Sequence, residues 1–390
     1  MNQQAPAPIS FHPSLAAVLI SAAFAALVLG SESQGLVFGL LAGGGAGTLL
    51  AHRLGWLDRV GSSAAAWPRA FGMAIVAATV AVCLGFHDDA FVLFLVATVM
   101  VYMLACFGLN IQFGFVGVVN FAGASFLGVG CYTAAILTKH TAMPHLLVLL
   151  AGGLAAALVG SMLLVPVLKT RGHYAALVTI AFALLFKVFL EVNDVLGGPQ
   201  GLKSGGFKLL GWEFNRDIAL GSSSGSFYLS YLALILTLVV LGFVLARRLE
   251  ESWLGLKLDA VRLDEVSSAC FGLAIPRWKI LAFTIGNFYC GVAGAFLATL
   301  LGYIAPANFA FGDSLILISI IILGGLGSLW GTVVATAIVI ILPEKFQILQ
   351  EYRFLLYASL VIVILLFRPQ GLLPRRVRRF ELLRRGGGHE

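Results

Sequence analysis

Apolar stretches long enough to cross a lipid bilayer recur along most of this sequence. A transmembrane helix needs about 20 consecutive apolar residues, and hydrocarbon admits only folds that satisfy their own backbone hydrogen bonds. Of the 390 residues, 60% are hydrophobic and only 11% are charged, whereas a soluble domain carries about 25% charged residues. The sequence therefore predicts an all-α polytopic membrane protein, in which the 45 glycines would let helices pack closely.

The apolar segments are separated by shorter polar connections. To within a few residues they cover 14–30, 35–51, 70–86, 90–109, 123–138, 145–168, 173–190, 227–246, 278–301, 311–342 and 353–367. The segment 311–342 is too long for one ordinary span, and Gly324, Gly325 and Gly327 interrupt its middle. We expect it to be a pair of short passes or a re-entrant hairpin, which makes about 11–12 transmembrane or re-entrant helices in all.

The net charge of +7 is concentrated in short connections and in the carboxy-terminal tail. Because positive residues gather in cytoplasmic loops, we expect the connections around 52–69, 169–171 and 247–279 and the basic tail 375–390 to be cytoplasmic. The longest external connection would then be 193–226. This distribution is typical of membrane topology and does not predict nucleic-acid binding. The amino terminus has no basic run before its first apolar segment, so we expect an uncleaved first helix.

A second interruption lies at 108–123, where glycines alternate with Asn110, Gln112 and Asn120. Non-helical backbone at membrane depth persists only where protein or a water-filled cavity satisfies it, and broken helices often border the substrate path of transporters. One interpretation therefore places these three residues, with Gly324, Gly325 and Gly327, along a translocation pathway. The other is a tight turn at the cytoplasmic membrane face with glycines used for packing.

The segment 247–279 is charged and amphipathic, yet bilayer-length apolar stretches flank it on both sides. Asp259, Arg262, Glu265 and Ser268 recur three to four residues apart, and Gly272 would end the helix. A short amphipathic helix held outside the bilayer favours docking of a soluble protein. The alternative is a helix resting on lipid, but its many acidic residues argue against anionic lipid as the sole partner.

The sequence does not favour ATP hydrolysis, ion coupling or metal binding by this chain. The stretch GGPQGLKS at 197–204 has Leu202 where a phosphate-binding loop needs glycine, so we expect no ATPase site in this chain. The pair Lys187 and Glu191, at i,i+4 spacing, is interpreted as structural rather than ion-coupling. The five scattered cysteines lack a CxxC pair and are expected to be inert buried thiols. No catalytic residue, metal site or cofactor is predicted, and an independent channel, an ion-coupled carrier or a membrane enzyme are the disfavoured alternatives.

Six stretches together resemble the permeases of branched-chain amino-acid ABC importers, of the LivM type rather than the shorter LivH type. They are GLNIQFGFVGVVNFAGASFLGVGCYTAAIL (108–137), RGHYAALVTIAFALLFKV (171–188), GGPQGL (197–202), LDEVSSACFGLAIPRWKILAF (263–283), ILGGLGSLWG (322–331) and FRPQGLL (367–373). The similarity covers about 99–374. It implies extra amino-terminal transmembrane helices at 1–89, a permease core at 90–374 and the cytoplasmic tail at 375–390.

The resemblance also implies that 262–276 is the coupling loop, similar to the EAA---G motif that docks on an ABC ATPase. The matching residues 266–272 have serines in place of alanines, and the glutamate appears one place early, as Glu265. The contact residues expected from it are Arg262, Asp264, Glu265, Ser267, Ser268 and Gly272. The implied partners are a LivH-type second permease, two LivG/LivF-type ATPases, a solute-binding protein and the lipid of the bacterial inner membrane. The implied cargo is leucine, isoleucine or valine, with urea or short amides as the alternative on the same scaffold.

Overall fold

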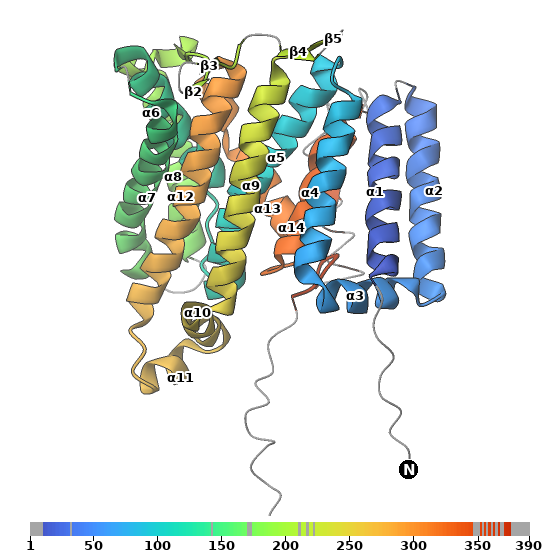
Figure 1. The fold of residues 1–390 in the computed structure, drawn as a ribbon. Helices are drawn as coiled ribbons and strands as arrows, with labels where there is room; N and C mark the ends of the chain where they lie inside the picture. Colours follow the sequence, from blue (N-terminus) through green and yellow to red (C-terminus); the bar gives the residue numbers. More distant parts are fainter. Residues whose placement is uncertain are drawn as a thin grey trace, which may run out of the picture. The chain divides into compact units, whose positions relative to one another are not determined.

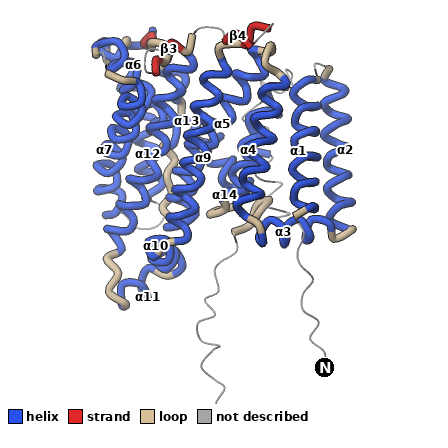
Figure 2. Tube along the Cα trace, viewed as in Figure 1, coloured by secondary structure: helices blue, strands red, loops and turns tan. Residues whose placement is uncertain are grey.

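The computed structural model describes residues 11–345 except 32, 142, 170–173, 210–211, 216–217 and 221–222, and beyond these 352, 355, 358–359, 362, 366 and 370–375. These residues are almost entirely helical, with a few two- or three-residue strands (Figures 1 and 2). The chain divides into two compact units, one of 1–97, 216–232 and 342–350 and one of 98–215, 233–341 and 351–390. The three-part division expected from the sequence stays a prediction.

The first unit is built on four helices that precede residue 90. They are α1 (His12–Gly30), α2 (Gln34–Arg53), α3 (Trp56–Ala66) and α4 (Pro68–Gly85). The polar connection at 52–69 is thus itself largely helical. The short helix α3 packs on α1, α2 and α4 and runs across their ends (Figure 1). A hydrogen bond of 3.1 Å between the Ser63 and Ser14 hydroxyls, both fully buried, joins α3 to α1. A short ribbon of β4 (Ile218–Leu220) and β5 (Ser223–Gly225) also belongs to this unit.

Longer helices make up the second unit, and three of its members (α5, α9 and α14) extend from one unit into the other. The helices are α5 (Ala90–Asn110), the π-helix η1 (Ile111–Val116), α6 (Gly123–His140), α7 (His145–Lys169), α8 (Tyr174–Val192), α9 (Tyr228–Glu251), α10 (Trp253–Leu263), α11 (Glu265–Cys270), α12 (Ile275–Leu301), α13 (Phe311–Gly324) and α14 (Leu329–Lys345). The helix α12 packs most extensively against α6 and α7, and these three helices form the core of the unit.

Small residues set the spacing inside this core. A Cβ atom added to Gly130 of α6 would lie 2.1 Å from the Gly291 carbonyl oxygen of α12, and one added to Gly294 would lie 1.9 Å from the Leu127 oxygen. On the same face of α12, a Cβ on Gly291 would lie 2.4 Å from the Gly152 oxygen of α7. Backbones approach this closely only where no side chain intervenes, as the high glycine content led us to expect.

Both interruptions expected from the sequence are present. The helix α5 passes into η1, which ends at Gly117 in the left-handed region (φ +74°). The apolar segment 311–342 is broken into α13 and α14, and Gly325 and Gly327 lie at φ +106° and +87° in the connection. Because side chains other than glycine are strained at such angles, these glycines determine where the helices break.

Short strands lie at the end of the second unit opposite α11 (Figure 1). After α8 the chain makes two short 3-10 turns, η2 (Asp194–Leu196) and η3 (Gly198–Gln200), before β1 (Leu202–Lys203). The strand β1 pairs with β6 (Tyr303–Ile304), which directly follows α12. A ribbon of β2 (Lys208–Leu209) and β3 (Trp212–Glu213) and the turn η4 (Pro306–Phe309) complete this end.

Six described helices are long and apolar enough to cross a membrane, or up to seven if a bent pair counts as one span. Together with the helical architecture they confirm an all-α polytopic membrane protein. The helix α13 is apolar but shorter, and most of the expected segment 353–367 lies outside the described residues. The total of about 11–12 transmembrane or re-entrant helices therefore stays a prediction.

Candidate coupling and translocation site

The charged segment between α9 and α12 forms two helices, and the single amphipathic helix expected from the sequence is wrong in this respect. The break is at Asp264, whose carboxylate accepts hydrogen bonds from the backbone N–H groups of Val266 (2.9 Å) and Ser267 (3.1 Å). Asp264 is therefore the N-cap of α11. The hydroxyl of Ser267 also donates to Asp264 (2.7 Å). These bonds lower the pKa of Asp264, the side-chain bond most, so the cap stays charged as pH falls towards the ordinary aspartate range.

The first of the two helices, α10, is anchored to the rest of the second unit. Ser252 caps its amino terminus by accepting from the N–H groups of Leu254 and Gly255. Leu258 and Val261 are fully buried, and α10 packs against η1 and α12. Burial of one apolar face on two other elements holds α10 in a defined position, which makes it a firm base for the helix that follows.

Exposed apolar side chains lie on the second helix, α11, and just before and after it. Leu263, Val266 and Phe271 are 74%, 75% and 87% exposed. Glu265 binds Lys279 of α12 through an ion pair of 2.6 Å. At the other end, Gly272 ends the helix as predicted: its N–H donates to Ala269 and that of Leu273 to Ser268, with Gly272 at φ +80°.

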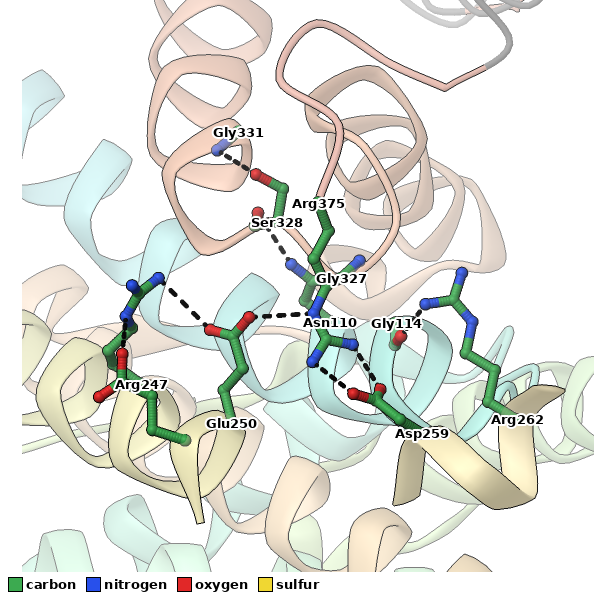
Figure 3. Close-up of polar contacts among 11 residues, drawn as sticks. Asn110, Gly114, Arg247, Glu250, Asp259, Arg262, Gly327, Ser328, Gly331 and Arg375 are labelled. Atoms are coloured by element: carbon green, nitrogen blue, oxygen red, sulfur yellow. Dashed lines mark hydrogen bonds and ion pairs between the residues drawn. The ribbon is translucent and has the colours of Figure 1, made fainter. Parts of the chain in front are cut away.

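The six expected contact residues separate into two groups. Asp264, Glu265, Ser267 and Gly272 are exposed on or beside α11, whereas Ser268 is buried. Arg262 is exposed too, but its Nη1 is already bound, donating to the Gly114 carbonyl oxygen in η1 (Figure 3). Burial and the nearby positive charge of Arg375 lower the pKa of Arg262.

Asn110 joins the two helix breaks. Its side-chain oxygen accepts from the Gly327 N–H (2.7 Å), while its Nδ2 donates to the Ser328 oxygen (3.0 Å) and the Thr332 hydroxyl (2.9 Å). One fully buried amide thus holds together the break after α5 and the break before α14 (Figure 3). Asn110 and Gly327 are 217 residues apart along the chain.

Gln112 and Asn120 form a second buried cluster with Asn287 of α12. The Gln112 amide donates to the Phe283 oxygen (3.0 Å) and to Asn287 (2.9 Å), and its oxygen accepts from Asn120 (2.8 Å). All three amide side chains are fully buried. Among the residues that the structure describes, the Nδ2 of Asn287 has no hydrogen-bond partner. A pathway role for Asn110, Gln112, Asn120, Gly324, Gly325 and Gly327 stays a prediction; their observed contacts hold the interior of the second unit together.

The sequence analysis did not find the ion network behind Arg262. Arg375 binds Asp259 through two parallel bonds (2.6 and 2.9 Å) and Glu250 through its Nε (2.9 Å), and its guanidinium lies 4.6 Å from the centre of the Phe115 ring. The sequence predicts Arg375 to be the first residue of the basic cytoplasmic tail. Its position two residues after the stretch FRPQGLL, which resembles the family, is the one sequence signal for a role of Arg375. Its partners Asp259 and Glu250 lie 116 and 125 residues away, too far for residue spacing to reveal the pairs.

Cysteine placement corrects one further expectation. Cys83, Cys106, Cys131 and Cys290 are buried, as expected, but Cys270 is exposed at the end of α11. It lies on the amphipathic segment rather than within an apolar stretch, which is why the general expectation of buried thiols is wrong for it.

The family described as branched-chain amino acid transport system, permease component, matches residues 91–367. The chain belongs to this family. It is similar to the high-affinity branched-chain amino acid transport system permease protein LivM of Escherichia coli K12, with 34% identity over 70% of this chain and 68% of the relative. No solved structure matches the chain.

The permease is also similar to two shorter relatives with related names. It is 27% identical to the permease protein BraD of Pseudomonas aeruginosa PAO1, over 70% of this chain and 92% of the relative. It is 23% identical to the permease protein LivH of Salmonella typhimurium LT2, over 70% and 91%. The higher identity to LivM confirms the LivM-type resemblance drawn from the sequence, and the chain is a multi-pass transport subunit.

Proposed function

We propose that this permease is the membrane-spanning subunit of an ATP-driven importer for branched-chain amino acids in a bacterial inner membrane. The relatives named for that transport system supply the cargo class. The observation that carries the coupling role is α11: a short capped helix with exposed apolar side chains on it and at both its ends, while α10 is anchored by buried residues. An exposed apolar patch of this kind is typical of a protein-docking site.

The complete importer contains, in this proposal, a LivH-type second permease, two LivG/LivF-type ATPases and an external solute-binding protein. ATP is hydrolysed on the ATPases, and this chain receives their movement through α11. Leu263, Val266 and Phe271 provide the apolar contact, and Asp264, Glu265, Ser267 and Gly272 surround it. Ser268 acts from beneath, because it is buried, whereas Arg262 is exposed and links this surface to Gly114 of η1.

Two substitutions test the role of α11 in the assembled transporter reconstituted in proteoliposomes. Glu265→Lys breaks the ion pair with Lys279 and places two like charges together. Gly272→Val forces a branched side chain to φ +80°, at a cost of about 1–2 kcal/mol. We expect each to lower leucine uptake per ATP hydrolysed by about tenfold, equivalent to about 1.4 kcal/mol of coupling. Urea measured in parallel distinguishes the alternative cargo.

The matched control is Glu191→Lys on α8, because Glu191 is likewise a partly exposed glutamate paired with a lysine (Lys187, 3.5 Å). It should leave uptake and hydrolysis near the wild-type values. The docking assignment is wrong if assembly, hydrolysis and uptake all survive both changes in and beside α11. Uptake by the purified chain without ATPases would instead favour a channel or an ion-coupled carrier.

A further inference from the structure

The segment that carries Arg375 is attached to the end of α13. The Leu372 N–H donates to the Leu323 oxygen (2.8 Å) and the Leu373 N–H to the Gly324 oxygen (3.2 Å). Carbonyl groups at a helix carboxy terminus lack partners within the helix, and here the segment 371–373 supplies them. Its backbone also lies directly on the break, because a Cβ on Gly371 would be 2.4 Å from the Gly325 Cα. Residue 375 therefore moves with the break between α13 and α14.

From that position the Arg375 side chain reaches three other elements. Its bidentate pair with Asp259 fixes it to α10 and its bond to Glu250 fixes it to α9 (Figure 3). Its guanidinium also lies over the Phe115 ring of η1. The side chains of Arg375 and Glu250 are each 11% exposed and that of Asp259 is 23% exposed. Forked arginine–carboxylate bonds are directional and strong when water is largely excluded, so α10 cannot move independently of Arg375.

Arg262 makes the second connection between α10 and the breaks, and the two arginines converge on one glycine. A Cβ on Gly327 would lie 2.7 Å from the Arg375 Cδ, 3.1 Å from the Gly114 oxygen and 3.3 Å from the Arg262 Nη1. The Gly327 N–H is itself bound by Asn110. A displacement of α10 must therefore either shift both breaks or separate these ion pairs and hydrogen bonds.

We propose that Arg375 is a positioning residue that passes the displacement of α10 to the helix breaks at Gly114 and at 325–328. The proposal rests on the docking role of α11 given above. It assigns a transmission role to a residue outside the docking helix and outside the expected pathway. Without Arg375, the ATPases still dock on α11 and still hydrolyse ATP, but α10 moves without carrying the breaks with it.

Arg375→Ala in the complete reconstituted transporter tests this proposal. We expect hydrolysis to stay within about twofold of wild type while uptake per ATP hydrolysed falls about tenfold, a loss of about 1.4 kcal/mol of coupling. The control is Arg247→Ala: Arg247 also pairs with Glu250 (3.6 Å) and with Glu251 (2.8 Å), but all three lie on α9. Because Arg247 itself pairs only with residues of α9 among the ion pairs described, its loss leaves the Arg375 pairs in place, and the ratio of uptake to hydrolysis should not change.

Two further variants keep the test decisive if Arg375→Ala does not assemble. Arg375→Lys keeps the charge but loses the fork and the stacking, so it should restore the ratio only in part. Asp259→Asn removes the charge from the α10 side of the pair and should lower the ratio in the same direction. A proportional fall of hydrolysis and uptake in these variants would mean a purely structural role and would overturn the proposal, as would an unchanged ratio. If the wild-type complex shows no ATP-dependent uptake at all, it is the proposed function that fails.

Discussion

The side chain of Asn110 stabilises two separate parts of the second unit. It supplies one acceptor and two donor bonds to the connection that begins α14, and it lies where α5 passes into η1. A buried backbone N–H without a partner is costly, and the Gly327 N–H obtains its partner from this side chain alone among the contacts described. The residue therefore stabilises both breaks at once.

Asn110→Ala should lower the free energy of unfolding by about 1–3 kcal/mol, because it leaves the Gly327 N–H buried and unsatisfied. Thermal unfolding of the purified permease in detergent measures this change. Asn308→Ala is the control, since Asn308 is an exposed asparagine in η4 and should shift the midpoint little. Equal midpoints for the two variants would contradict the junction role of Asn110.

At the scale of elements, the second unit depends on how closely α12 approaches its two neighbours. Gly294 contacts the α6 backbone, and Gly291, three residues earlier on the same face of α12, contacts the α7 backbone, so both neighbouring helices approach this face at near-contact distance. In lipid the hydrophobic effect does not drive helices together, and tight van der Waals packing takes its place. An ion pair between Lys279 of α12 and Glu265 of α11 also connects α11 to this closely packed helix.

Gly294→Ala should disrupt this packing, because the new methyl group would begin 1.9 Å from the Leu127 oxygen. Overpacking of this kind costs about 1–3 kcal/mol or more, measured as a lower unfolding midpoint or a lower yield of folded protein. Gly72→Ala in α4 has open space around the added methyl and should be neutral or stabilising by up to about 1 kcal/mol. If Gly294→Ala were tolerated equally well, the close approach of α6 and α12 would be refuted.

At the scale of the molecule, α12 separates the two ends of the second unit that would face opposite sides of a membrane. It begins five residues after α11 and ends directly before β6, and its 27 residues span about 40 Å. That length exceeds the hydrocarbon core of about 30 Å. In Figure 1, α11 and the strands β2 and β3 lie at opposite ends of this unit. With a cytoplasmic α11, the β1–β6 ribbon faces outward.

Labelling with a membrane-impermeant maleimide tests this sidedness. The native Cys270 is exposed on α11 and should react in inside-out vesicles but not in intact cells or right-side-out vesicles. Lys203→Cys, made in a Cys270→Ser background, replaces an exposed residue of β1 and should show the reverse pattern. Reaction of both sites from the same side would rule out the importer topology.

The sequence by itself determined the class of fold, the family and the two places where helices break. Each of these depends on local composition: apolar length for the spans, glycine for the breaks, and a set of short motifs for the family. It also located Gly272 as the end of α11, because a left-handed helix end favours glycine. The division of the charged segment at Asp264 was within its reach, since an aspartate before a short helix is a typical N-cap.

Only the tertiary structure decided what the polar residues bind. Arg262, expected as an ATPase contact, also binds Gly114, and Arg375, assigned from the sequence to the cytoplasmic tail, joins α9, α10 and η1. The hydrogen-bonded pairs among them lie 116 to 148 residues apart along the chain. No local sequence pattern encodes such pairs. They form only when helices pack closely at glycines and so bring the two helix breaks, α10 and α11 together.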